Sequence, residues 1–147
     1  MRTKPFNKAS FEKYDRAARI RTGQHLTLKG YKVKDHPDKY AQDLIATRDN
    51  NSICVECEVK VVWSGPDFPY ETVQLPQRKQ KFFNEPTLFY IWNKQLDNAV
   101  TFLSEEIKDL TPVEVPNKYV SKGEYFYQIP MDLVTKVKVR IKDEANT

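Results

Sequence analysis

Two carboxylates and one amine stand where they could share a site. Asp43 precedes a short apolar run, and Glu58 and Lys60 follow within the segment 53–63, in which polar and apolar residues alternate. In a strand, residues i and i+2 project from the same face, so Glu58 and Lys60 would point the same way, with Cα atoms about 6.7 Å apart. The other face of that strand is wholly apolar, as expected of a strand that packs on a core.

These groups suit the hydrolysis of a phosphodiester bond. Magnesium prefers oxygen ligands and commonly binds through one or two carboxylates, so Asp43 and Glu58 could hold one ion. The Lys60 ammonium could stabilise the charge that develops on the phosphoryl group or, with its pKa lowered by burial, help to deprotonate a metal-bound water. The alternative is an exposed hairpin face with a cross-strand ion pair, which contributes little to stability.

The remaining pattern predicts the elements that must position these residues. Ser10 is a suitable N-cap for an amphipathic helix that reaches about residue 28, with an interruption at Gly23 as one option. A short turn at 49–52 predicts an antiparallel hairpin that brings Asp43 towards the Glu58 face. The other expected elements are strands at 31–34, 40–47, 72–75, 87–92, 99–103, 124–129 and 137–141, and a short basic helix at 77–83. This order predicts a single mixed α/β domain.

Length and composition fit one globular domain. The chain has 147 residues, of which 39% are hydrophobic and 30% are charged. It contains no apolar run long enough to span a membrane, and no apolar stretch of the secretory type follows its basic N-terminus, so we expect a cytoplasmic protein. Cys54 and Cys57 would face opposite sides of one strand, which favours free thiols over a disulfide or a zinc site.

The positive charge is concentrated near the N-terminus. Residues 1–34 contain ten basic and two acidic residues, although the whole chain carries a net charge of only +4. This asymmetry favours a polyanionic partner, most often nucleic acid. The basic residues that we expect to contact phosphates lie on the two predicted helices: Arg16, Arg19, Arg78, Lys79 and Lys81. The alternative is that these are solvated helix faces.

Taken together, the motifs resemble the PD-(D/E)xK nuclease superfamily, with a layout most similar to Holliday-junction resolvases and small restriction-type endonucleases. The resemblance covers an acid in the first helix, a Gly-Tyr pair before a strand, Asp-Leu-Ile-Ala at 43–46, Val-Glu-Cys-Glu-Val-Lys at 55–60, the basic helix and the apolar strand 87–92. It implies a restriction-endonuclease-like fold, a mixed central sheet of four strands flanked by helices. It also implies that Asp43, Glu58 and Glu12 bind the metal and that Lys60 is the catalytic lysine.

Two departures from the family pattern qualify this resemblance. Gln42 stands where a proline is usual, a position that binds nothing in the site. No Gln-x-x-x-Tyr motif follows the lysine, which argues against the exonuclease branch. Among secondary candidates, Gln74 could reach the site, whereas Glu56 is expected to lie one residue pair too far from Lys60.

The sequence therefore predicts a flexible basic arm at 1–7 and a nuclease-like domain at 8–147. The expected function is a Mg²⁺-dependent endodeoxyribonuclease, with Mn²⁺ able to substitute, DNA as the partner and branched or junction DNA as a candidate substrate. A homodimer would supply two sites for paired cuts. Two alternatives remain open: a nuclease-fold protein that binds nucleic acid without cutting it, and a small protein-interaction module.

Overall fold

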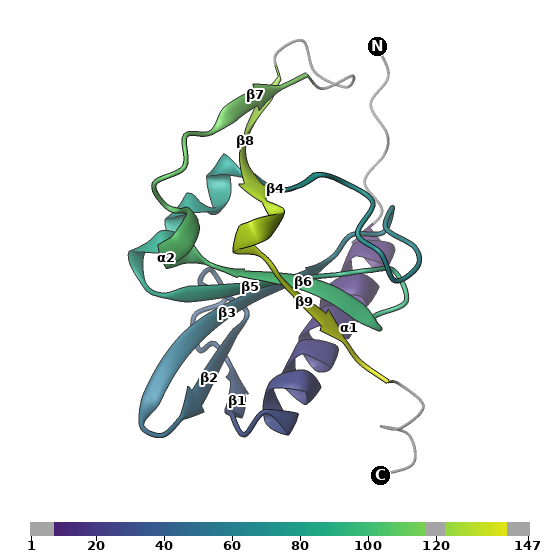
Figure 1. Cartoon of the computed structure of the whole chain (residues 1–147). Coiled ribbons are helices and arrows are strands. Elements are labelled where there is room, and N and C mark those ends of the chain that lie inside the picture. Colours follow the sequence, from purple (N-terminus) through teal and green to yellow (C-terminus); the bar gives the residue numbers. More distant parts are fainter. Residues whose placement is uncertain (1–7, 117–122, 141–147) are drawn as a thin grey trace.

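The central layer of the protein is a six-stranded mixed sheet (Figure 1). The computed structural model describes residues 8–116 and 123–140, so the arm expected at 1–7 lies outside the described residues. In sheet order the strands are β1 (Lys32–Asp35), β2 (Leu44–Arg48), β3 (Asn51–Val59), β5 (Thr87–Trp92), β6 (Asn98–Leu103) and β9 (Thr135–Lys138). β3 and β5 are parallel, and the other neighbours are antiparallel.

A second sheet of three strands lies at the end of the molecule opposite the β2–β3 hairpin (Figure 1). Its order is β4 (Thr72–Pro76), β8 (Glu124–Pro130) and β7 (Val113–Val115). The expectation of a mixed α/β fold is confirmed, but the central sheet has six strands instead of the expected four. The second sheet arises because β4 pairs with β8, far away in the sequence, and strand patterns do not reveal such a partner.

The helices differ in length and type. α1 (Lys8–Leu28) runs without a break, so the interruption considered at Gly23 does not occur. Packing of α1 against β1, β2 and β3 outweighs the cost of an internal glycine, about 1 kcal/mol. The basic segment forms a 3₁₀ helix, η1 (Gln77–Asn84), and two short helices follow, α2 (Ser104–Ile107) and η2 (Met131–Leu133). No helix among the described residues is long and apolar enough to cross a membrane.

Two hydrophobic cores cover the two faces of the large sheet. Val55 and Cys57 of β3 pack with Ala18 and Leu26 of α1 on one face. The other face packs against β4, β8, η1 and α2 through residues such as Phe89. Because side chains alternate along a strand, Glu56 and Glu58 point to the face opposite α1. Trp63 and Trp92 are buried core residues, and both cysteines are free and buried.

The β2–β3 hairpin sets the register on which the site depends. Asp49 and Asn50 both have positive φ, 52° and 67°, as a two-residue type I′ turn requires. Arg48 is therefore paired with Asn51, and Leu44 with Val55. β2 begins at Leu44 rather than near residue 40, and β3 ends before Lys60, so both strands are shorter at the site than the sequence pattern suggested.

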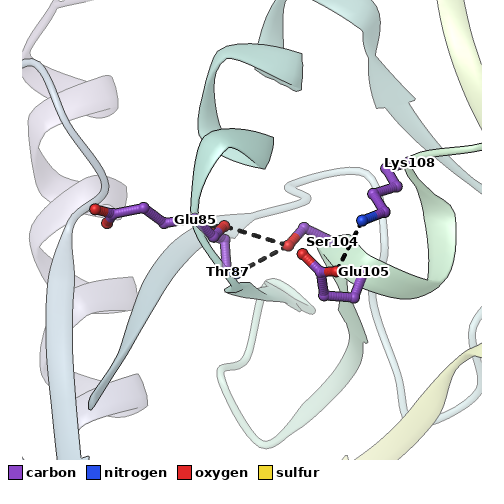
Figure 2. A network of polar contacts seen from close by, with 5 residues as sticks. All are labelled: Glu85, Thr87, Ser104, Glu105 and Lys108. Atoms are coloured by element: carbon purple, nitrogen blue, oxygen red, sulfur yellow. Dashed lines mark hydrogen bonds and ion pairs between the residues drawn. The ribbon is translucent and has the colours of Figure 1, made fainter.

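Hydrogen bonds fix the end of η1 to the start of β5 and α2. The Thr87 N–H donates to Ser104 Oγ at 2.9 Å, and the Ser104 hydroxyl donates to the Glu85 carbonyl at 3.5 Å (Figure 2). The Thr87 hydroxyl also donates to the Phe82 carbonyl within η1 at 2.7 Å. On the nearby surface, Lys108 pairs with Glu105. The two buried bonds of Thr87 hold η1 in place over the large sheet.

Candidate active site

Asp43 stands directly before β2, where this strand stops pairing with β3. The ladder ends at the Leu44–Val55 pair, and the next β3 N–H that faces β2 belongs to Cys57. That N–H donates to Asp43 Oδ2 at 3.0 Å, so a side-chain carboxylate replaces the missing backbone acceptor. This bond fixes the position of the Asp43 carboxylate beside β3.

Glu56 is the acid that the hairpin register places opposite Asp43. Its side chain is only 12% exposed, and its Oε2 accepts a charge-assisted hydrogen bond of 2.6 Å from Lys79 Nζ of η1. Burial, followed by the negative charge of Asp43, raises the pKa of Glu56 to about 7, although Lys79 opposes the shift. Two close carboxylates and one amine therefore meet at the start of β2.

Asp15 brings a third carboxylate from α1. Partial burial and then the charge of Asp43 raise the pKa of Asp15, whereas Arg19 and Lys79 lower it. Arg19 Nε lies 3.4 Å from its carboxylate. Although α1 and η1 cover opposite faces of the sheet, their charges interact here because β2 has not yet begun to separate them. We refer to Asp15, Asp43, Glu56 and Lys79 as the carboxylate cluster.

Gln42 ties the two halves of the cluster together. Its side chain is buried, and its Nε2 donates to Thr87 Oγ1 at 3.0 Å and to the Phe82 carbonyl at 3.4 Å. The residue next to Asp43 is thus bonded to the end of the helix that carries Lys79. The sequence pattern treated this position as one that binds nothing, whereas the structure gives its amide a positioning role.

The structure does not bring Lys60 to Asp43. Lys60 lies four residues beyond Glu56, a Cα separation of about 13 Å along an extended strand. Its Nζ lies instead 5.3 Å from the centre of the Tyr70 ring. Glu58 is exposed and lies one same-face position beyond Glu56. Glu58 and Lys60 therefore lie further along the chain than the residue opposite Asp43. The signal in the sequence was the two-residue turn at Asp49 and Asn50, because it sets the register that places Glu56 opposite Asp43.

The first-helix acid is also displaced from its expected position. Glu12 is exposed on α1, and Asp15, three residues later, is the α1 acid whose pKa responds to Asp43. Three residues are about one helical turn, so the α1 acid that interacts with the charge of Asp43 lies one turn beyond the predicted Glu12.

The basic residues predicted to contact nucleic acid fall into two groups. Arg16 and Arg19 line a groove of about 830 Å³ between α1 and β1, which reaches Leu44, next to Asp43. On η1, Arg78 lies 3.8 Å from Glu124, Lys81 is exposed beside the Phe82 ring, and Lys79 points into the cluster. This groove, which we call the α1 groove, therefore brings two of the predicted arginines near the residue that follows Asp43.

The carboxylates of the cluster belong to the class of ligand that magnesium prefers. Asp43 and Glu56 offer hard carboxylate oxygens from neighbouring strands, and magnesium commonly uses one or two carboxylates together with water and phosphate oxygens. Within residues 8–116 and 123–140, no group of three or more histidine, cysteine, aspartate or glutamate side chains is arranged to hold a metal ion. A magnesium site here would thus rest on two protein ligands, with Asp15 nearby.

No protein-family model and no curated protein matches the chain. The assignment of a function therefore rests on the geometry of the carboxylate cluster and the grooves beside it.

Proposed function

We propose that the protein is a magnesium-dependent endodeoxyribonuclease whose site is the carboxylate cluster. The observation that carries the proposal is the meeting of Asp43, Glu56 and Lys79 from three different elements at one sheet end. The order of α1, β1, the β2–β3 hairpin, the basic η1 and β5 supports it, because the resemblance to PD-(D/E)xK nucleases rests on this order of elements. Manganese, with similar oxygen preference, should substitute for magnesium.

Each residue of the cluster has a role in this proposal. Asp43, held by the Cys57 N–H, and Glu56 would bind the ion, and Asp15 would adjust the local charge. When bound, magnesium polarises the scissile phosphate and lowers the pKa of water. The Lys79 ammonium would donate to a phosphate oxygen at the cluster, which stabilises the charge that builds up during in-line displacement. Lys79 thus takes the role that the sequence assigned to Lys60.

DNA would approach along the basic groove. Arg16 and Arg19 line the α1 groove, which reaches Leu44, and charge-assisted contacts to phosphates position DNA without reading its sequence. This surface is separate from the proposed metal ligands. Loss of a ligand should therefore abolish cutting and spare most of the binding.

The test is a cleavage assay on supercoiled plasmid and on a labelled four-way junction, with Mg²⁺, Mn²⁺ or EDTA. We expect cutting with either metal and none in EDTA. Asp43→Asn should abolish cutting, and Glu114→Gln, an exposed acid on β7, is the matched control. Cleavage that persists at the wild-type rate in Asp43→Asn, or a wild type that never cuts, would refute the proposal.

The second candidate is a protein that binds nucleic acid without cutting it. The α1 groove favours this function, because its arginines do not require a metal to bind phosphates. A salt-dependent gel shift in EDTA, combined with no cleavage under any metal, would select it. The absence of both binding and cleavage would leave the protein-interaction module.

A further inference from the structure

A second groove lies between the end of β3 and the three-stranded sheet, with a volume of about 750 Å³. Its walls combine aromatic rings with a few polar groups. The residues that matter here are Glu58, Lys60, Phe68, Tyr70, Gln74 and Phe126. We call it the aromatic groove.

Tyr70 offers an accessible ring in this groove. Its side chain is 48% exposed, although large aromatic residues usually bury more of their surface. The edge of Phe68 supports it, with ring centres 5.6 Å apart and planes at 70°. Lys60 Nζ lies over one face of the ring, 5.3 Å from its centre, so a positive charge and an aromatic ring are in contact. Proteins that hold single-stranded nucleic acid use this combination: a ring for the base and a cation for the phosphate.

The other polar groups in the groove favour a base over a phosphate. Glu58 and Glu71 are carboxylates that repel a phosphate but accept hydrogen bonds from the amino groups of bases. The amide of Gln74 can both donate and accept. Lys60 is the cation among the lining residues and would bind the phosphate next to such a base.

The groove begins beside the carboxylate cluster. Glu58, one of its lining residues, is the next residue after Glu56 on the same face of β3, with Cα atoms about 6.7 Å apart. The groove therefore lies within reach of the nucleotide next to a phosphate bound at the cluster. A base can enter only when it is unpaired and unstacked, because base pairing and stacking cover its edge and faces within a duplex.

We propose that the aromatic groove binds one unpaired nucleotide next to the scissile phosphate, with its base on Tyr70. This rests on the proposed nuclease function and narrows its substrate class to DNA that is single-stranded beside the cut. Branched, gapped and overhanging DNA would then be bound more tightly than continuous duplex.

Fluorescence anisotropy in EDTA tests this without cleavage. The probes are a labelled duplex with a short single-stranded gap and a continuous duplex of the same length. Tyr70→Ala should weaken binding of the gapped probe by about 5- to 150-fold, the range expected for one stacked base, and should leave the continuous duplex unchanged. Tyr70→Phe keeps the ring and should bind like the wild type. Tyr125→Ala removes a tyrosine of matched exposure, 49%, from outside the groove, and should also bind like the wild type.

The outcomes separate the groove from the nuclease activity. Equal affinity of wild type and Tyr70→Ala for the gapped probe overturns the groove proposal, even if the wild type cuts DNA with magnesium. Failure to bind either probe overturns it as well. A Tyr70-dependent preference for gapped DNA supports the proposed nucleotide-binding role of the groove. If the same protein never cuts DNA, only the nuclease proposal is refuted. Thermal unfolding of each variant verifies that the fold is intact.

Discussion

Glu56 and Glu58 stand two residues apart on the same face of β3, yet their surroundings differ. Glu56 is largely buried, paired with Lys79 and close enough to Asp43 for its pKa to rise to about 7. Glu58 is exposed and lines the aromatic groove. The difference arises because β2 pairs with only part of β3, so the loop that carries Asp43 reaches one acid and not the other.

The two lysines near β3 show the same contrast. Lys60 follows β3 in the sequence but lies beside Tyr70, whereas Lys79 is distant in the sequence and lies 2.6 Å from Glu56. A motif read along the chain selects the first lysine, and the docking of η1 supplies the second. Strand register and helix docking therefore decide which charged groups lie together.

Replacing Glu56 or Glu58 by glutamine should give the largest difference in cleavage rate. Glu56→Gln should lower the rate of magnesium-dependent DNA cleavage by about 10³-fold, because a metal contributes several kcal/mol to transition-state stabilisation. Glu58→Gln should lower it by less than about tenfold, since Glu58 lines the groove only. Initial rates on a labelled junction measure both. A larger loss of rate in Glu58→Gln than in Glu56→Gln would favour Glu58, the acid predicted from the sequence, as the metal ligand.

Lys79 and Lys60 should differ in whether their loss affects cleavage or binding. Lys79→Ala should reduce cleavage by about 10²- to 10⁴-fold, the range for a positioned group that assists proton transfer or stabilises charge. Lys60→Ala should mainly weaken the binding of gapped DNA. Rates at saturating DNA, together with anisotropy in EDTA, separate the two effects. If Lys60→Ala abolished cleavage at saturating DNA and Lys79→Ala did not, the assignment of Lys79 to the active site would be contradicted.

Gln42 tests whether helix docking builds the Glu56 site. Gln42→Ala removes a buried amide that holds Thr87 and the Phe82 carbonyl, so the free energy of unfolding should fall by about 1–3 kcal/mol. Cleavage should fall as Lys79 loses its position, whereas Tyr70-dependent binding should persist because the end of β3 and the three-stranded sheet form that groove. Urea unfolding and the two functional assays measure these effects. Unchanged cleavage in a destabilised but folded variant would reduce Gln42 to a structural residue.

The raised pKa of Glu56 predicts the smallest effect, a pH dependence of stability. Because this pKa rises from 4.5 to about 7 on folding, the contribution of Glu56 is fully present below pH 4.5 and is lost as the pH rises through 7. The free energy of unfolding should fall over that range by roughly 1–3 kcal/mol from this residue. Thermal melts should show the fall in the wild type and in Glu58→Gln, but not in Glu56→Gln. Magnesium should restore stability near pH 8, since it binds the ionised form. A wild type with the same pH profile as Glu56→Gln would contradict the assignment.

Local patterns in the sequence were enough to predict most of the elements. Alternation identified β3 and its apolar face, β5 was predicted with its observed bounds, and the amphipathic repeat identified α1. The turn at Asp49 and Asn50 indicated the β2–β3 hairpin and so brought Asp43 to the acidic face of β3. These features follow from interactions between residues that are close in the chain, which is why they can be read there.

Only the tertiary structure decided which acid and which lysine join Asp43. Glu56 is selected by the point at which β2 stops pairing, and Lys79 by η1, which Gln42 and Thr87 hold in place. The pairing of β4 with β8, which forms one wall of the aromatic groove, is likewise a contact between distant segments. The physical reason is that these contacts depend on how separate elements pack, and no spacing within one element encodes that.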